Sequence, residues 1–312
     1  MTSGSVDFTV NRDDIIRTAL RTIGWIGIDQ VPTANDIDIC SLHLNLIVKQ
    51  WQGRSDFGGN LKAWSRKTGY IFLQKDQHSY LLGPSGDHAT STYYSTTISA
   101  SEAAGQTVIS VTSITNMTNG DNIGIVLDSG SIHWSTISTS GGGTVTIVDS
   151  LPSASSSGKY VFWYTSKIRR PLSIISASIR DTEASDLPIV TMIRESYEKL
   201  PTKSIDGTPS AYLYEATLIN GTMTFDVDPD DLTKVVRIVF LGAIEDFDAA
   251  TDTPDYPQEW YAPLIDQLAI RIAPTYRMQV SNEMKLNRDE SLSIARNTDP
   301  ETCEEYFQPG RG

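Results

Sequence analysis

The sequence contains little cysteine: Cys40 and Cys303 are the two in 312 residues, and they lie far apart in the chain. A secreted domain held by disulfides would carry more, so we expect assembly in a reducing cytoplasm. The first ten residues lack both the basic region and the apolar core of a signal peptide. No apolar run approaches the roughly 18 residues that a membrane span requires, so we expect no membrane association.

Basic side chains are also scarce. The chain has 25 Lys and Arg against 38 Asp and Glu, which gives a formal net charge of -13. A domain that binds nucleic acid normally presents a basic patch to the phosphates. The sequence therefore predicts either no contact with DNA or an acidic wall along which DNA slides without specific binding. The basic run Lys167, Arg169 and Arg170 is expected to pair with acidic groups of another domain or subunit.

Motifs for catalysis and metal binding are absent from the sequence as well. The four histidines, His43, His78, His88 and His133, are not spaced for a helical zinc site. There is no Gly-x-Ser-x-Gly elbow, and the glycines at 141–143 are not followed by the residues of a phosphate-binding loop. We therefore predict a protein that is not an enzyme, with no catalytic residues, no metal and no cofactor.

One acidic segment imitates a calcium-binding loop. Asp226, Asp228 and Asp230 match the first three ligands of such a loop. The sixth position is Asp231, where glycine is needed, and the twelfth is Arg237, where a bidentate glutamate is needed. We therefore interpret the segment as an acidic turn after a strand.

Two other functions remain open from the residues alone. A cell-wall hydrolase could use paired carboxylates such as Asp226 or Glu245, because such pairs hydrolyse glycosides at suitable separations. A glycan-binding module could occupy residues 93–165, with His133 and Trp134 on one strand as the binding part.

Helical periodicity marks the first 53 residues. Asn11 is placed to cap a first helix, and Thr33 with Asp36 forms a capping box for a second helix that Gly53 ends. The second helix is apolar on two sides, so both sides must be buried. One stripe is expected to face the core of its own subunit: Ile37, Cys40, Leu44, Ile47, Val48 and Trp51. The other stripe is predicted to form the subunit interface: Ile39, Leu42 and Leu46.

The middle of the chain shows the alternation typical of β-strands. Tyr70–Leu73 and Tyr80–Leu82 are expected to form a hairpin, and Asn220-Gly221 is a strong hairpin signal between two further strands. Short alternating runs separated by turn residues predict a small sandwich or barrel within residues 93–165. These runs are Thr107–Val111, Asn122–Leu127, Ile132–Ile137 and Thr144–Val148.

Helical spacing returns after Pro257, which suits a first helical position, and a last helix is expected from Met284 to Ala295. We thus predict an α+β fold in four parts. They are a discontinuous helical domain (1–68 plus 257–298), an antiparallel β domain (69–92 plus 166–256), an inserted β module (93–165) and an extended C-terminal arm (299–312).

Several segments, taken in order, resemble the head-to-tail adaptor proteins of short-tailed bacteriophages, also called tail accessory proteins. The matching segments are DIIRTALRTIG (14–24), PTAND (32–36), VKQW (48–51), YLLGPSGD (80–87), RPLSII (170–175), IRD (179–181), GTPSAY (207–212), YPQEWY (256–261) and LAIRIAPTY (268–276). Their order and spacing across most of the chain carry the resemblance, since each segment alone is weak.

The resemblance implies a virion structural protein, assembled in the host cytoplasm, whose copies form a twelve-fold ring under the portal. Such a ring extends the channel through which genomic DNA passes without specific binding. It also provides docking surfaces for a tail nozzle or hub and for tail fibre or spike proteins. By the same resemblance, the C-terminal arm would reach the portal through Tyr306, Phe307, Gln308 and Pro309.

Overall fold

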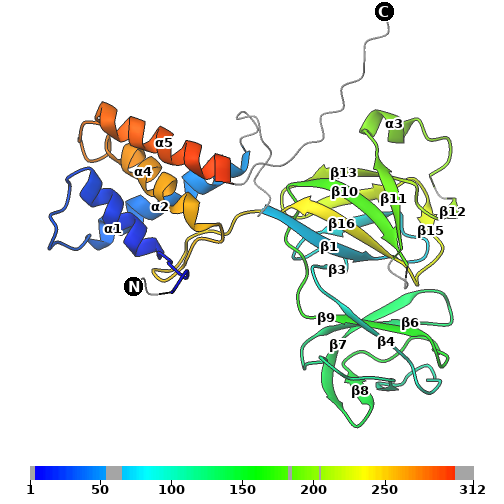
Figure 1. The fold of residues 1–312 in the computed structure, drawn as a ribbon. Helices are drawn as coiled ribbons and strands as arrows, with labels where there is room; N and C mark the ends of the chain where they lie inside the picture. The colour runs from blue at the N-terminus through cyan, green and yellow to red at the C-terminus, as the bar shows by residue number, and fades with distance from the viewer. Residues whose placement is uncertain (1–3, 54–64, 182–184, 204, 299–312) are drawn as a thin grey trace, which may run out of the picture. The chain divides into compact units, whose positions relative to one another are not determined.

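The computed structural model describes residues 4–53, 65–181, 185–203 and 205–298 (Figure 1). The fold mixes α-helices with two large, mainly antiparallel sheets. Its contacts divide the chain into two compact units, Met1–Arg66 with Ile244–Gly312 and Lys67–Ala243. We call them the helical unit and the β unit.

The helical unit is built around one central helix. α4 packs against each of the other three α-helices of this unit, and its residues Leu264, Leu268 and Ile272 are fully buried. The spacing of these three residues puts them on one face of the helix, as the sequence predicted. The elements of the unit are α1 (Arg12–Thr22), α2 (Ala34–Gly53), the 3-10 turn η2 (Gln258–Trp260), α4 (Tyr261–Ile272) and α5 (Asn282–Thr298).

Both predicted helix caps are confirmed. The Asp14 N–H donates to Asn11 Oδ1 at 2.9 Å, so α1 begins where the sequence placed it. At α2, the Asp36 N–H donates to Thr33 Oγ1 at 3.2 Å, and the Thr33 N–H donates back to Asp36 Oδ2 at 3.0 Å. Pro257 differs from the prediction, because it precedes the short 3-10 turn and α4 begins only at Tyr261.

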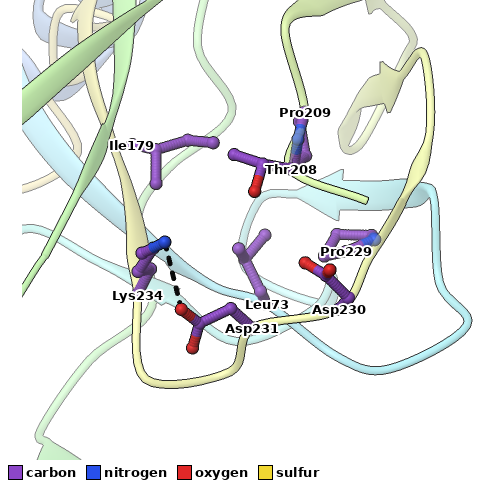
Figure 2. A pocket seen from close by; sticks show the side chains of 8 residues that line it. All are labelled: Leu73, Ile179, Thr208, Pro209, Pro229, Asp230, Asp231 and Lys234. Carbon is purple, nitrogen blue, oxygen red and sulfur yellow. Dashed lines mark ion pairs between the residues drawn. The ribbon is translucent and has the colours of Figure 1, made fainter. Parts of the chain in front are cut away.

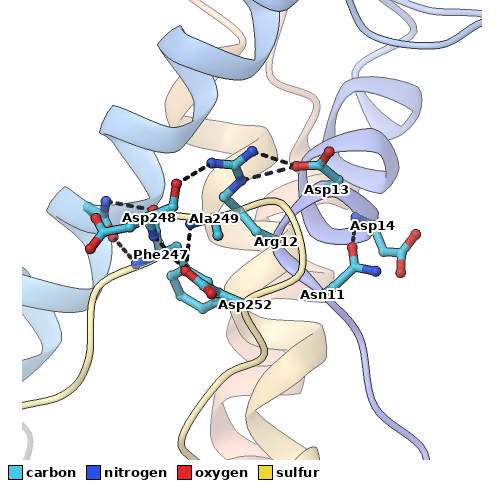
Figure 3. A network of polar contacts seen from close by, with 9 residues as sticks. Asn11, Arg12, Asp13, Asp14, Phe247, Asp248, Ala249 and Asp252 are labelled. Atoms are coloured by element: carbon cyan, nitrogen blue, oxygen red, sulfur yellow. Dashed lines mark hydrogen bonds and ion pairs between the residues drawn. The ribbon is translucent and has the colours of Figure 1, made fainter.

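The segment before η2 is tied to the first two helices by a network of polar contacts (Figure 3). The Arg12 N–H donates to the Asp252 carbonyl at 2.8 Å, and the Arg12 guanidinium donates to the Asp248 carbonyl at 2.9 Å. The Asn45 side chain exchanges two hydrogen bonds with the backbone of Phe247, at 2.9 and 3.3 Å. Arg12 therefore fixes this loop at α1, and Asn45 fixes it against α2.

The segment before η2 belongs to the helical unit, so the boundary between this unit and the β unit differs from the predicted one. The sequence prediction placed residues up to 256 in the β domain. In the structure, Ile244, Phe247 and Tyr256 are buried in the core of the helical unit. The segment lacks helical periodicity, so its sequence pattern gave no sign of which core would receive it.

The larger sheet of the β unit has eight strands. In spatial order they are β2 (Ser79–Leu82), β14 (Gly221–Phe225), β13 (Ala211–Ala216), β11 (Asp186–Thr191), β10 (Ser173–Arg180), β16 (Val235–Leu241), β1 (Arg66–Phe72) and β3 (Ala89–Thr90). The strands β12 (Asp206–Gly207) and β15 (Asp228–Pro229) form a separate parallel pair, and α3 covers Arg194–Glu198.

The predicted hairpin between residues 70–73 and 80–82 is wrong. Both strands exist, but β1 pairs with β3 through Tyr70 and Thr90, whereas β2 pairs with β14 through Tyr80 and Met223. β2 is thus the first strand in the spatial order and β1 the seventh of eight, so the two are not neighbours. Alternation identifies a strand, but it does not identify the partner, which packing selects.

The hairpin at Asn220-Gly221 is confirmed, with a shifted turn. β13 and β14 pair antiparallel from Ala216 and Gly221 onward, so the turn comprises residues 217–220. This turn exposes Leu218 and Ile219 at 92% and 62%.

The smaller sheet is a six-stranded barrel. In spatial order its strands are β4 (Tyr94–Thr97), β9 (Tyr160–Tyr164), β6 (Asn122–Val126), β7 (Ile132–Gly141), β8 (Thr144–Ile147) and β5 (Val108–Ser110). The first and last strands meet at a bridge between Ile98 and Val111. Two backbone hydrogen bonds of 2.9 Å, Ser99 N–H to the Ser110 carbonyl and Thr112 N–H to the Thr97 carbonyl, close the barrel. The four strands predicted here are present, and β4 and β9 are additional.

The barrel and the eight-stranded sheet share side-chain contacts within the β unit. The His88 imidazole stacks on the Trp134 indole with ring centroids 3.8 Å apart, and His88 Nδ1 lies 2.6 Å from the Tyr164 hydroxyl. Burial, with the charge of Lys167 nearby, lowers the pKa of His88 to about 3. His88 is therefore neutral at physiological pH, as a ring stacked in an apolar setting must be.

Candidate functional site

The two apolar stripes of α2 have different surroundings. Cys40, Leu44, Ile47 and Val48 are fully buried in the core of the helical unit. On the other side, Leu42 is 61% exposed, Leu46 is 43% exposed and Ile39 is half-buried. We call Ile39, Leu42 and Leu46 the α2 surface. Within the described part of one copy these three side chains form an apolar strip on an otherwise polar helix face, which is typical of an interaction site.

Two of the polar groups around the α2 surface, Lys49 and His43, are paired or neutral, whereas Asp38, one turn before Leu42, is exposed. Lys49 Nζ lies 2.6 Å from Asp246 Oδ1 and donates to the Ile244 carbonyl at 3.0 Å. Burial and the charge of Arg271 lower the pKa of His43, which shares this side of the helix. The α2 surface is therefore bordered by a lysine paired with Asp246 and by a neutral histidine. Both reduce the free-energy cost of removing water from this surface when a partner binds.

A buried carboxylate anchors the start of α2. Asp36 is 5% exposed and accepts hydrogen bonds from the Tyr276 hydroxyl at 3.0 Å and from Thr33. Burial opposes ionisation of Asp36, but the hydrogen bonds from Thr33, Tyr276 and Trp25 outweigh it and lower its pKa. Burial raises the pKa of the neighbouring Cys40 thiol to about 11. These contacts orient the helix that carries the α2 surface.

A second exposed apolar set follows α1. Trp25, Ile28 and Val31 are 44%, 85% and 73% exposed, and we call them the loop surface. The loop is held by the Arg21 guanidinium, which donates to the Ile28 carbonyl at 2.5 Å, and by the Gly27 N–H, which donates to Gln30 Oε1 at 2.9 Å. Sequence reasoning missed this surface, although three large apolar residues in a loop bounded by Gly24 were a visible signal.

The calcium-like aspartates are bound by their own chain. Asp226 accepts from the Ser210 N–H at 3.0 Å and from the Ser210 hydroxyl at 2.5 Å. Asp228 is 6% exposed and lies 3.0 Å from His78 Nδ1. Among the described residues, no three His, Cys, Asp or Glu side chains gather as a metal site would require. These contacts agree with the interpretation as an acidic turn.

Asp230 and Asp231 border a shallow pocket in the β unit (Figure 2). Asp231 is paired with Lys234 at 3.1 Å, and the space enclosed by the lining side chains is too small for a water molecule. The lining is formed by Leu73, Ile179, Thr208, Pro209, Pro229, Asp230, Asp231 and Lys234. A sugar or peptide therefore has no room in this pocket.

The residues named for the alternative functions are engaged elsewhere. Trp134 stacks on His88 and packs against Phe72 at 5.0 Å, so its ring is part of the contact between barrel and sheet. His133 Nε2 lies 3.2 Å from the Asp149 carbonyl. The Lys167 ammonium, expected to pair with another domain or subunit, donates to the Gly86 carbonyl of its own unit at 2.5 Å.

The segment predicted to bind the portal, Tyr306, Phe307, Gln308 and Pro309, lies outside the described residues. In the part of the chain that the structure describes, no helix is both long enough and apolar enough to span a bilayer. No protein-family model matches the chain, and no curated protein matches it. The resemblance to phage adaptors therefore stays a prediction.

Proposed function

We propose that this protein is a virion structural protein that acts by binding rather than by catalysis. Its copies form a ring, of twelve members by the family resemblance, under the portal of a short-tailed bacteriophage. The ring extends the DNA channel and receives tail components such as a nozzle or hub and fibre or spike proteins. The protein is assembled in the host cytoplasm and resides in the neck of the particle.

One observation carries this proposal: the exposed apolar strip on α2. Leu42 and Leu46 remain 61% and 43% exposed although the opposite stripe of the same helix is fully buried. Apolar side chains on a regular helix face, bordered by paired charges, suit packing against another protein. Five of the nine segments that carry the resemblance lie in the helical unit, and the other four lie in the β unit.

The remaining parts take roles that follow from the resemblance. The helical unit makes the ring, the β unit with its barrel is the peripheral part that tail proteins contact, and residues 299–312 reach the portal. The net charge of -13 suits a channel wall, because phosphates are repelled and DNA slides without a specific contact. No cofactor or metal takes part in this function.

Particle mass tests the proposal directly. The purified protein is measured alone and mixed with the portal protein of the same phage, by native mass spectrometry or light scattering. The proposal expects a discrete ring of many copies, either free or on the portal. A chain that stays monomeric under both conditions would refute it. A parallel assay on peptidoglycan, with Asp226→Asn as comparison, is expected to show no hydrolysis by either form.

A further inference from the structure

One cation beside the α2 surface has no acidic partner. The Arg271 guanidinium of α4 donates to Gln50 Oε1 at 3.1 Å, and burial together with the charge of Arg271 lowers the pKa of His43. His43 and Gln50 lie one turn before and after Leu46, so they border the α2 surface on its Arg271 side. Among the described residues, no carboxylate is paired with Arg271. This border of the α2 surface therefore suits a ligand that is both apolar and acidic.

The acidic side chains of α2 and α4 do not meet this cation. Asp36 is buried and engaged in hydrogen bonds at the start of α2. Asp38 is exposed, but it precedes Gln50 by twelve residues, which is about 18 Å along the helix axis. Asp266, on α4, accepts a hydrogen bond from α5 at 2.9 Å. A carboxylate that reaches Gln50 from outside the described residues can therefore pair with Arg271.

α5 brings the end of the described chain to the same region. The Arg288 guanidinium donates to Gln267 Oε1 and the Ser291 hydroxyl donates to Asp266, both at 2.9 Å, so α5 runs antiparallel to α4 and its last turns lie beside η2. The ring of Trp51, at the end of α2, lies 5.5 Å from the tryptophan ring of η2. α5 therefore ends near the C-terminal end of α2.

The segment that follows α5 has the composition that this border requires. Residues 299–312 carry Glu301, Glu304 and Glu305 before the two aromatic residues Tyr306 and Phe307. In extended form, residues 299–307 span at most ~30 Å. Packed helices lie about 8–10 Å apart, so α2 is at most about 20 Å from α5 across α4. The segment is therefore long enough to cross α4 and to place both aromatic rings on the α2 surface.

We propose that residues 299–312 cover the α2 surface of their own copy in the free subunit, with the glutamates at Arg271 and with Tyr306 and Phe307 on the apolar strip. Because the segment is tethered, its effective concentration is on the order of millimolar, and a contact of modest affinity keeps the surface covered. The role of this contact rests on the proposed function. The portal binds the segment and removes it from the α2 surface, which is then free to pack against a neighbouring copy.

Disulfide formation with the native Cys303 tests the contact in the full-length protein. Gln50→Cys is introduced at the exposed border residue, and mild oxidation is expected to join it to Cys303 within the monomer, as peptide mass spectrometry shows. Cys40 is fully buried and its thiol pKa is raised to about 11, so it stays unreacted. Leu286→Cys, at a leucine of α5 that is 66% exposed, is the matched control and should form its bond with Cys303 about tenfold more slowly.

Two sets of substitutions show which groups hold the segment. Arg271→Gln should slow the bond between Gln50→Cys and Cys303 severalfold, whereas Arg277→Gln, which removes an exposed arginine after α4, should leave its rate unchanged. Tyr306→Ala combined with Phe307→Ala should slow it about tenfold. Equal rates for Gln50→Cys and Leu286→Cys, or a bond that joins two copies, would overturn the contact.

The portal protein separates this contact from the proposed function. Its addition should suppress the disulfide at Gln50→Cys, and the variant with Tyr306→Ala and Phe307→Ala should self-associate without portal at concentrations where the wild type is monomeric. A variant that stays monomeric, while the wild type forms rings on the portal, would overturn the gating role and leave the proposed function intact. If no form of the protein assembles with portal, the proposed function and the gating role both fail, and the disulfide rates alone decide the contact.

Discussion

Gln74 and Ile132 exchange two hydrogen bonds across the β unit: the Ile132 N–H donates to Gln74 Oε1, and Gln74 Nε2 donates to the Ile132 carbonyl, both at 3.0 Å. The side-chain amide of Gln74 thus pairs with both backbone groups of Ile132, the first residue of β7, in the way that a neighbouring strand would. It connects the loop after β1 to the barrel at a position 58 residues further along the chain.

Gln74→Leu is expected to destabilise the β unit by about 1–3 kcal/mol, because the N–H and carbonyl of buried Ile132 lose their partners. Urea unfolding followed by tryptophan fluorescence measures this loss. Gln77→Leu is the matched control, since the Gln77 side chain donates only to the Ser79 carbonyl of its own turn. Equal stability of the Gln74 and Gln77 variants would contradict the role given to Gln74.

Gly86→Ala is expected to cost the β unit about 1–3 kcal/mol, because a Cβ at position 86 would lie 2.1 Å from the Leu81 carbonyl oxygen and backbone must move. Gly141→Ala serves as control, since no heavy atom lies within 4 Å of its Cβ position. The control should change stability by less than about 1 kcal/mol in either direction. Thermal unfolding of the two variants beside the wild type decides the point.

Tyr276→Phe is expected to destabilise the helical unit by about 1–3 kcal/mol, since it removes a hydrogen bond to a buried carboxylate. The wild-type pKa of Asp36 is lowered below its ordinary 3.8. The stability that this group contributes is therefore present above that value and is lost as the pH falls through the lower folded pKa. The variant should lose less stability on acidification, measured by the helical circular dichroism signal. An unchanged acid dependence would contradict the assignment.

His88 should make the β unit less stable as the pH falls below the ordinary histidine value of 6.5. The folded pKa is lowered to about 3, so between these values the unfolded chain binds a proton that the folded chain does not. Stability is thus full above 6.5 and falls by at most about 1.4 kcal/mol per pH unit. His88→Phe keeps a stacking ring and should flatten this slope in urea titrations. A slope as steep as that of the wild type would assign it to other groups.

Leu42→Asp is expected to weaken ring assembly on the order of 100-fold, because an unpaired carboxylate would be buried at the contact. The fold should be unaffected, since Leu42 is 61% exposed. Leu286→Asp on α5, where the leucine is 66% exposed, makes the same chemical change outside the proposed contact and should leave assembly intact. Light scattering over a concentration series compares the two, and equal behaviour would count against the α2 surface.

Local signals in the sequence predicted local structure well. The Asn11 cap, the Thr33–Asp36 capping box and the hairpin before Gly221 each depend on residues close in the chain, and all three are present. The two-sided character of α2 was also readable, because 3.6-residue periodicity sorts side chains onto faces without knowledge of partners.

Features that depend on distant parts of the chain could not be predicted. The pairing of β1 with β3 and of β2 with β14 was chosen by packing across the β unit. Trp134 was a candidate binding residue of the glycan-binding alternative, but His88, 46 positions earlier in the sequence, stacks on its ring. The side chains of the loop surface are exposed because no other described segment packs over them. Helical or strand periodicity does not reveal whether a distant segment will cover a loop.

The bridge between Ile98 and Val111 affects how barrels of neighbouring copies can contact one another. A barrel whose first and last strands are joined offers no row of free N–H and carbonyl groups at an edge. Copies held at the close spacing of an assembly therefore cannot add strands to one another through this module. Aggregation by edge pairing is suppressed there by topology, and neighbouring barrels can meet through their side chains alone.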